Sequence, residues 1–498
     1  MLASVHSTNL FGIEGRVVMV ETHVSPGLPS YSVVGLPDTA GRESRERVRA
    51  AMLSSDLPWP NTRVTVNLAP AAVRKRGAGL ELAIAVALLV AADDLPAAAL
   101  EGVGVFGELG LDGVVRPVPG SLALVEALVN AGVERVVVPS DNAAEAALVP
   151  RATVLPARTL GELRDCLKGE LPWPDVPSSP PPPLDDLDSL DLAEVRGLAA
   201  ARTALLAAAA GGHHVLFSGE PGAGKTMLAR RFPTITARLD ADDALTVTRI
   251  LSATGIHRSG SLVTRAPLRA PHHSATTAAL VGGGSAGDMR PGELTRAHLG
   301  ALFLDEVAEF APSVLDALRQ PLEERVVRVS RSGVTVEYPA DAVLIACCNP
   351  CPCGRRDREC RCSDTARDRY RRRLSAPFLD RFDLRVRVSA PDAAEPTGTS
   401  SADSRALVER AVARQAGRLG GSPWRRNAHV PARALGELCA LSGPARARFV
   451  VVCRDLRLSG RGAASVQRVA RTLADLADDD IISEDHIEIA ASLRQDVP

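Results

Sequence analysis

The clearest candidate for chemistry in this sequence is a glycine-rich turn that ends in a lysine and a threonine. Gly219, Gly224, Lys225 and Thr226 follow the spacing G-x-x-x-x-G-K-[ST]. Glycines let backbone N–H groups close around phosphate oxygens, the lysine can reach the β- and γ-phosphates, and the hydroxyl can bind Mg²⁺. The predicted nucleotide-binding loop consists of Gly219, Glu220, Pro221, Gly222, Ala223, Gly224, Lys225 and Thr226.

Two carboxylates end an apolar run about 80 residues later, in GALFLDEVAEF (300–310). We expect Asp305 to hold Mg²⁺, directly or through water, together with Thr226. We expect Glu306 to polarise the water that attacks the γ-phosphate. An ordinary strand end with exposed acids is the alternative, and the preceding phosphate loop disfavours it.

A third apolar run, AVLIACCNP (342–350), ends at Asn349, whose amide could contact the γ-phosphate or the attacking water. Short apolar runs thus precede the glycine-rich loop, the acidic pair and the asparagine. Such runs are typical of buried parallel strands, whose carboxyl ends bind ligands in α/β sheets. A P-loop α/β core is therefore predicted to position these side chains.

Six of the nine cysteines lie in CCNPCPCGRRDRECRC (347–362). Four of them form two C-x-C pairs, namely Cys351, Cys353, Cys360 and Cys362. Four thiolates on a short loop can close a tetrahedral Zn²⁺ site, although C-x-C is tighter than the usual C-x₂-C and Cys348 could replace one ligand. A redox switch and a set of free cysteines are the alternatives. Cys347, on the strand itself, is expected to be buried.

The segment 355–373 is strongly basic, with nine arginines against four acids and a net charge of +5. The whole chain has a net charge of −1, so any nucleic-acid surface must be local. Arginine suits contact with a phosphate backbone, and Arg355 and Arg356 are the candidates here. A solvated loop is the alternative.

Two low-complexity stretches divide the 498 residues. Residues 172–189 are proline-rich and acidic and predict an extended linker. Residues 392–404 are small and polar and predict a flexible linker. The resulting blocks are 1–171, 190–391 and 405–498, in agreement with the two or three domains that the length predicts.

The start of the chain lacks the pattern of a signal peptide, and the longest apolar run is too short to span a bilayer. A cytoplasmic protein without membrane contact is therefore expected. In that compartment, clustered cysteines are more often metal ligands than disulfides.

The phosphate loop, the acidic pair, the polar-tipped strand and a late arginine together resemble the AAA+ ATPase core. The late arginine, Arg381, lies in LSAPFLDRFDLRVRV (374–388), on a turn between a predicted helix and a predicted strand. The resemblance implies that Arg381 acts as an arginine finger on the nucleotide of a neighbouring subunit in a ring. A surface salt bridge is the alternative for this residue.

A closer resemblance extends along nearly the whole chain. RAPHHSATTAALVGGG, RPGELTRAHLGALFLDE and NPCPCG are similar to the magnesium-chelatase-like ATPases of the YifB/ComM type. Members with studied activity resemble hexameric DNA helicases that migrate branches during recombination and natural transformation. The resemblance implies ATP and Mg²⁺ as cofactors, a homo-oligomer that is expected to be a hexamer, and single-stranded or branched DNA as partner.

The first block resembles the proteolytic domain of Lon proteases, in TVNLAPAAVRKRGAGLELAIAVALLVA (65–91) and in 104–142. Those enzymes use a serine activated by a lysine. Gly79 occupies the place expected for the serine, and Ser121 with Leu122 the place expected for the lysine. The resemblance therefore implies a Lon-like α+β domain without proteolytic activity.

The last block suits the helical lid of an AAA+ module, with a helix predicted over 458–476. The family resemblance implies that one of its arginines, Arg461 or Arg468, acts as sensor 2, and Arg461 is slightly favoured. A β-hairpin with an RSG tip is predicted in 325–346. Related ring helicases use a hairpin here as a DNA lever, so Arg328 and Arg331 are the expected contacts.

The sequence thus predicts a multidomain chain: a Lon-protease-like α+β domain, an AAA+ P-loop α/β core and a helical C-terminal lid. The predicted function is that of an ATP-hydrolysing ring motor acting as a DNA helicase or branch-migration factor in recombination or DNA uptake. A chelatase-like or chaperone-like ATPase that remodels a protein partner is the alternative. A basic channel would favour DNA, and an apolar aromatic channel would favour polypeptide.

Overall fold

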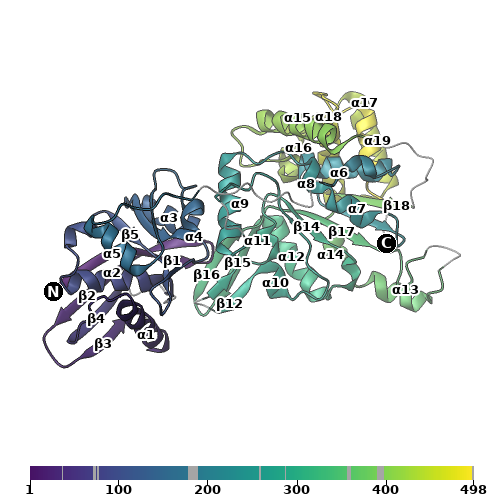
Figure 1. Cartoon of the computed structure of the whole chain (residues 1–498). Helices are drawn as coiled ribbons and strands as arrows, with labels where there is room; N and C mark the ends of the chain where they lie inside the picture. The colour runs from purple at the N-terminus through teal and green to yellow at the C-terminus, as the bar shows by residue number, and fades with distance from the viewer. Residues whose placement is uncertain are drawn as a thin grey trace.

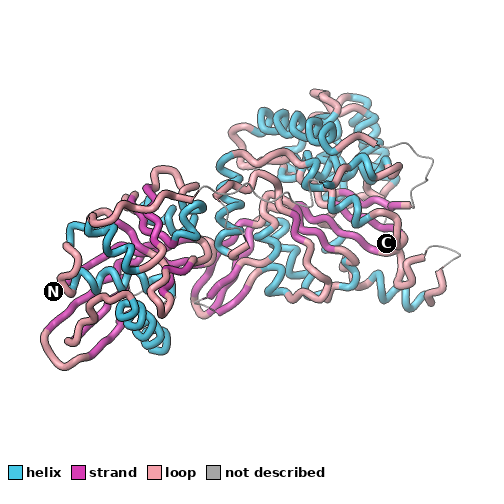
Figure 2. The backbone as a smooth tube through the Cα atoms, in the orientation of Figure 1, coloured by secondary structure: helices cyan, strands magenta, loops and turns pink. Residues whose placement is uncertain are grey.

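The computed structural model describes residues 1–35, 38–70, 75, 78–177, 189–256, 260–285, 288–355, 360–389 and 398–495. An N-terminal α/β domain lies beside a second α/β domain, and the C-terminal helices cover one side of the second domain (Figure 1). Figure 2 shows that the strands concentrate in the first two parts, whereas the third is helical.

The N-terminal domain contains a seven-stranded mixed sheet in the order β3-β4-β2-β1-β5-β8-β9. Its strands are β1 (Leu2–Phe11), β2 (Glu14–Ser25), β3 (Ser30–Val34), β4 (Arg63–Ala69), β5 (Val103–Val105), β8 (Arg135–Pro139) and β9 (Thr153–Ala157). Its α-helices are α1 (Asp38–Ser54), α2 (Glu81–Ala91), α3 (Ser121–Asn130), α4 (Ser140–Ala146) and α5 (Leu160–Lys168). Helix α2 is buried along its whole length, which explains why its sequence is apolar on every side.

The second domain contains a five-stranded parallel sheet in the order β11-β14-β17-β10-β18. Its strands are β10 (Val215–Gly219), β11 (Leu268–Arg269), β14 (Ala301–Leu304), β17 (Val343–Cys348) and β18 (Leu384–Val388). Its helices are α6 (Ala199–Gly211), α7 (Lys225–Arg230), α8 (Phe232–Ile235), α9 (Ala241–Ala253), α10 (Thr277–Val281), α11 (Glu293–Arg296), α12 (Pro312–Glu324), α13 (Asp364–Arg371) and α14 (Ala376–Leu379). The central strands are buried on both faces, as the apolar runs predict.

The C-terminal region packs against the second domain. Its α-helices are α15 (Ser401–Leu419), α16 (Leu435–Leu438), α17 (Gly443–Asp455), α18 (Gly460–Leu476) and α19 (Glu484–Ser492). Side chains from α6, α15 and α18 share one hydrophobic core cluster. The helix predicted over 458–476 is confirmed.

The predicted linkers need one correction. Helix α15 begins at Ser401, and Arg202 donates to the carbonyl of Thr399 at 2.8 Å. The hydroxyl of Ser401 also accepts the backbone N–H of Leu192 at 2.8 Å. Residues 398–404 are therefore packed against the core instead of forming a flexible linker. Of the linker predicted over 172–189, residues 178–188 lie outside the described residues.

Two β-hairpins extend from the second domain on the side that faces the first domain. The first pairs β12 (Gly283–Ser285) with β13 (Asp288–Arg290), and the second pairs β15 (Val326–Arg331) with β16 (Val334–Pro339). Ile13, in the turn between β1 and β2, lies in the same hydrophobic cluster as Val329 and Tyr338. The N-terminal domain therefore packs against the base of the β15–β16 hairpin (Figure 1).

Candidate nucleotide-binding site

The glycine-rich loop follows β10 directly, and α7 begins at Lys225. The Lys225 ammonium donates to the carbonyls of Gly219 at 2.6 Å and Glu220 at 2.8 Å, and to Oδ1 of Asn349 at 3.2 Å. Gly222 and Gly224 have φ angles of 81° and 86°, which side chains with a Cβ rarely adopt. The ammonium is buried inside the loop, in position to meet phosphate oxygens.

The expected magnesium ligands also meet. Oγ1 of Thr226 donates to Oδ2 of Asp305 at 2.8 Å, which joins the start of α7 to the end of β14. A hydroxyl and a carboxylate are oxygen donors of the kind that Mg²⁺ prefers, so these residues fit the ion. Glu306 follows in the left-handed backbone region, with φ of 48°, and its side chain is exposed.

These five residues come from three neighbouring strands of the parallel sheet. β14 pairs with β17, and β17 pairs with β10. Lys225, Thr226, Asp305, Glu306 and Asn349 therefore gather at the carboxyl edge of the sheet, which we call the nucleotide edge.

Arg381 lies at the other edge. It precedes β18, whose first residue Leu384 pairs with Val215, whereas Gly219 pairs with the last residue, Val388. From Leu384 to Val388 the strand rises by about 13 Å. Arg381 is therefore separated from the phosphate loop of its own subunit by the full length of β18. Its guanidinium pairs with Glu323 at 2.7 Å.

Of the two lid arginines, one joins Arg381. Arg461 donates to Oε1 of the same Glu323 at 2.9 Å. Arg468 donates to the carbonyl of Val430 at 2.6 Å and is thereby held within the lid. The arrangement favours Arg461 over Arg468 as the partner of Arg381.

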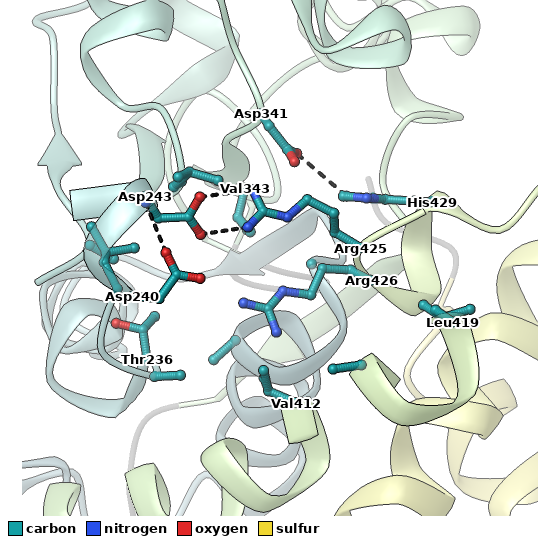
Figure 3. Close-up of a pocket in the computed structure, with 18 of the residues that line it drawn as sticks. Thr236, Asp240, Asp243, Asp341, Val343, Val412, Leu419, Arg425, Arg426 and His429 are labelled. Carbon is teal, nitrogen blue, oxygen red and sulfur yellow. Dashed lines mark hydrogen bonds and ion pairs between the residues drawn. The ribbon is translucent and has the colours of Figure 1, made fainter. Parts of the chain in front are cut away.

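Arg381, Arg461 and Arg468 line a cavity of about 520 Å³ at this opposite edge. Asp383 also lines this cavity and accepts a hydrogen bond from His213 at 2.9 Å. This hydrogen bond and the nearby positive charges hold the pKa of Asp383 well below its usual range, although burial acts to raise it. An adjacent cavity of about 400 Å³ lies between the core and the lid (Figure 3). No residue of the glycine-rich loop lines either cavity.

The adjacent cavity contains paired charges. Arg425 binds both carboxylate oxygens of Asp243, at 2.9 and 2.7 Å, and His429 lies 3.4 Å from Asp341 (Figure 3). Burial lowers the pKa of His429. These contacts join the first turn of α9 and the loop between β16 and β17 to the lid, so the cavity marks the junction of core and lid.

The four predicted cysteine ligands come together. The sulfur atoms of Cys351, Cys353, Cys360 and Cys362 all lie within 4.8 Å of one another. The Cys351 sulfur is 3.2 Å from that of Cys353 and 3.4 Å from that of Cys360. Hydrogen bonds from the backbone of Arg355 and from Cys351 lower the pKa of Cys353 to about 6, which favours the thiolate. Cys348 and Cys347 are buried in the strand, as predicted for Cys347.

The expected DNA contacts divide into two places. Arg328 and Arg331 lie on β15, on the predicted hairpin, with Ser332 and Gly333 at its tip. Arg328 pairs with Glu337 at 2.6 Å and also with Glu324. Arg331 donates only to the carbonyl of its neighbour Ser330, at 3.2 Å, among the described residues. Arg355 is exposed near the cysteines, and Arg356 lies outside the described residues.

The position where the Lon resemblance expects a serine, Gly79, faces the segment that leads to Ser121. A Cβ on Gly79 would lie 4.0 Å from Cγ1 of Val118, three residues before Ser121. The hydroxyl of Ser121 is buried and donates to Oε2 of Glu145 at 2.6 Å. Neither position carries the amine that a serine–lysine dyad needs.

Two contacts of the site escape sequence reasoning. Glu323 joins Arg381 and Arg461, and Gly354 lies against Pro221 of the glycine-rich loop. Both contacts join residues far apart in the chain, and no local pattern marks them.

Among the described residues, no helix combines the length and apolarity needed to cross a membrane. Three family models match the chain: "Subunit ChlI of Mg-chelatase" over 20–142, "Magnesium chelatase, subunit ChlI" over 191–395 and "Magnesium chelatase, subunit ChlI C-terminal" over 398–494.

Curated relatives match over almost the whole length. The uncharacterized protein Rv2897c of Mycobacterium tuberculosis is 41% identical, over 99% of both chains. YifB of Escherichia coli is 36% identical and competence protein ComM of Haemophilus influenzae is 35% identical, each over 99% of this chain and 97% of its own. The chain therefore belongs to the magnesium chelatase ChlI family, among its YifB- and ComM-like members.

Proposed function

We propose that the chain hydrolyses ATP at the nucleotide edge and that it does so as a ring. Lys225 binds the β- and γ-phosphates, and Glu306 accepts a proton from the attacking water. Asn349, held by Lys225, orients the γ-phosphate or that water. Thr226 and Asp305 hold Mg²⁺, which supplies charge neutralisation on the phosphates when bound.

The position of Arg381 is the main observation that supports a ring-shaped oligomer. An arginine at the edge opposite to its own phosphate loop cannot stabilise charge on its own nucleotide, but it can reach the nucleotide of a neighbour. Arg461 shares Glu323 with Arg381 and therefore enters the same neighbouring site. The AAA+ resemblance sets the expected ring at six subunits.

Mixing two inactive variants tests this arrangement. Arg381→Ala is expected to bind ATP normally and to lose hydrolysis by about 10³-fold or more. Lys225→Ala is expected to lose nucleotide binding. A mixture should regain activity, because each variant supplies the half-site that the other lacks. Arg454→Ala, an exposed lid arginine, is the control. Full hydrolysis by a purified monomer would contradict the proposal.

We further propose that hydrolysis drives movement on DNA, single-stranded or branched, with little dependence on base sequence. The support is the exposed Arg331 next to the hairpin tip, which forms no ion pair with any described residue, together with the basic residues near the cysteines. Phosphate contacts release counterions, so binding should weaken steeply with salt. Stimulation of hydrolysis by a protein partner, with no stimulation by forked DNA, would favour a chelatase-like or chaperone-like remodeller instead.

The first domain is proposed to be a Lon-like module without proteolytic activity that serves assembly or contact with substrate, in a protein that works in the cytoplasm. The buried Ser121–Glu145 pair and the glycine at position 79 support this proposal. Purified protein should not cleave casein with or without ATP. Proteolysis that vanishes with a substitution at Ser121 would contradict it.

The cysteine cluster is proposed to hold one structural zinc ion. Sulfurs in a tetrahedral site with Zn–S bonds of about 2.3 Å lie about 3.8 Å apart. The sulfurs of Cys353 and Cys360 are 3.8 Å apart, and the Cys351 sulfur lies closer to both, at 3.2 and 3.4 Å.

A further inference from the structure

The cysteine cluster lies against the glycine-rich loop. We call residues 351–355 and 360–362 the knuckle. The N–H of Gly354 donates to the carbonyl of Cys351 at 2.9 Å, which closes a turn. A Cβ on Gly354 would lie 2.7 Å from both Cδ and Cγ of Pro221, closer than real Cβ contacts allow. The knuckle backbone therefore touches the phosphate loop at a point where no side chain fits.

The knuckle also continues directly from the strand that carries Asn349. Cys351 is buried and lies two residues after Asn349, whose amide oxygen accepts from Lys225 at 3.2 Å. Any displacement of Cys351 is therefore transmitted over a very short stretch of backbone to a side chain of the nucleotide site.

The far side of the knuckle is anchored next to the acidic pair. Helix α13 follows Cys362, and its Tyr370 is buried in the cluster that contains Cys348. Just after α13, Arg373 donates to the carbonyl of Ala308 at 3.0 Å and to Glu309 at 2.6 Å. These residues follow Glu306 closely, so the knuckle is fixed between the glycine-rich loop and the acidic turn.

The two described parts of the knuckle meet through their sulfurs, since the Cys360 sulfur lies 3.4 Å from that of Cys351 and 3.8 Å from that of Cys353. Cys353 is exposed, and Cys360 and Cys362 are half-buried, so apolar packing supplies little stabilisation at these three positions. A metal that joins four thiolates orders its own loop, because a preformed site rarely exists without the ion.

We propose that the zinc-bound knuckle acts as a clamp that sets the position of the phosphate loop and of Asn349, so that loss of the metal weakens nucleotide binding. This inference rests on the proposed zinc site and on the proposed nucleotide site. It differs from a purely DNA-facing role of the cluster, in which metal loss would weaken DNA binding and leave nucleotide affinity unchanged.

The test measures zinc content and the affinity for a fluorescent ATP analogue in the same full-length protein. Cys360→Ser with Cys362→Ser removes two ligands that do not touch the phosphate loop. This double variant should lose zinc, and its nucleotide affinity should fall about tenfold, equivalent to roughly one charge-assisted hydrogen bond. Cys453→Ser, in α17, is the matched control and should keep both properties.

Gly354→Ala provides a second, independent variant. It keeps all four sulfurs but places a methyl group against Pro221, so zinc should remain while nucleotide affinity falls. If the double variant does not fold, chelation of zinc from the wild-type protein, followed by re-addition of zinc, should lower and then restore the affinity.

The outcomes of these experiments distinguish between failure of the zinc site, failure of the clamp and failure of the nucleotide site. Wild-type protein purified without chelator that contains no zinc would overturn both the zinc site and the clamp. Zinc-free protein that binds the analogue with wild-type affinity would overturn the clamp alone. Unchanged binding of the analogue by Lys225→Ala would overturn the nucleotide site on which the clamp rests.

Discussion

The β15–β16 hairpin and the basic segment 355–373 are both rich in arginine, and charge alone suggests one common role on DNA. The structure separates them. The hairpin precedes β17 and the basic segment follows it, so the two lie at opposite ends of the same strand (Figure 1). The hairpin packs against the N-terminal domain, whereas the knuckle packs against the glycine-rich loop. Similar composition therefore serves two environments, one at each edge of the sheet.

The two regions also differ in how many arginines are free. On the hairpin, Arg328 pairs with two glutamates, whereas Arg331 has no acidic partner in the described part of the chain. In the basic segment, Arg367 pairs with Asp364 and Arg373 pairs with Glu309. The exposed arginines of this segment without an ion pair to a described residue are Arg355, Arg361, Arg369, Arg371 and Arg372. Net charge therefore overstates the charge that a ligand can meet.

The largest effect is expected at the nucleotide edge. Glu306→Gln should lower the rate of ATP hydrolysis by about 10²- to 10⁴-fold, because an amide cannot accept the proton of the attacking water. ATP affinity and DNA affinity should stay near wild type, since the hairpin lies at the other edge. Rate measurements with Glu437→Gln as control check this, because Glu437 is exposed on the lid helix α16 and has no expected role in proton transfer. Wild-type hydrolysis by Glu306→Gln would show that the base is misassigned.

The next effect concerns the hairpin tip. Arg331→Ala with Arg328→Ala should end displacement of a labelled strand while hydrolysis continues. As single variants, Arg331→Ala should reduce DNA affinity more than Arg328→Ala, because the Arg328 charge is already paired within the hairpin. Losing one phosphate contact should lower the slope of log affinity against log salt by about 0.9. Equal slopes for the two single variants would remove the distinction.

A smaller effect on the motor is expected from the basic segment. Alanine at Arg369, Arg371 and Arg372, which are exposed and close together around the end of α13, should reduce DNA affinity while leaving strand displacement per ATP hydrolysed unchanged. Titration of forked DNA at two salt concentrations, combined with displacement assays, measures both quantities. Loss of displacement with intact affinity would mean that this segment, and not the hairpin, transmits the motion.

The smallest effect concerns the contact between the first domain and the hairpin. A Cβ on Gly12 would lie 3.0 Å from Cε1 and Oη of Tyr338, and Gly12 has φ of 66°. Gly12→Ala should cost about 1–2 kcal/mol from the backbone conformation and more from this contact. Gly132→Ala is the matched control, because its φ is 84° and nothing lies within 4 Å. Equal melting temperatures for the two variants would show that the contact is unimportant.

The sequence by itself determined the elements of the nucleotide edge. Each functional residue there follows a short apolar strand, as Asp305 follows β14 at once and Lys225 follows β10 after the glycine-rich loop. Because parallel strands end at one edge, local patterns were enough to bring these side chains together. The tip of the hairpin and the buried Cys347 follow from equally local patterns.

Only the tertiary structure decided which residues lie at the edge of the sheet opposite to the nucleotide edge, and which residues support the glycine-rich loop. Arg461 and Glu323 are 138 residues apart and meet through the packing of the lid. The packing of residues 398–404, the pairing of Arg328 and the contact of Gly354 with Pro221 likewise depend on non-local neighbours. Ion pairs and backbone contacts of this kind leave no periodic signal in the sequence, because they are set by the position of whole elements and not by the spacing of residues within one element.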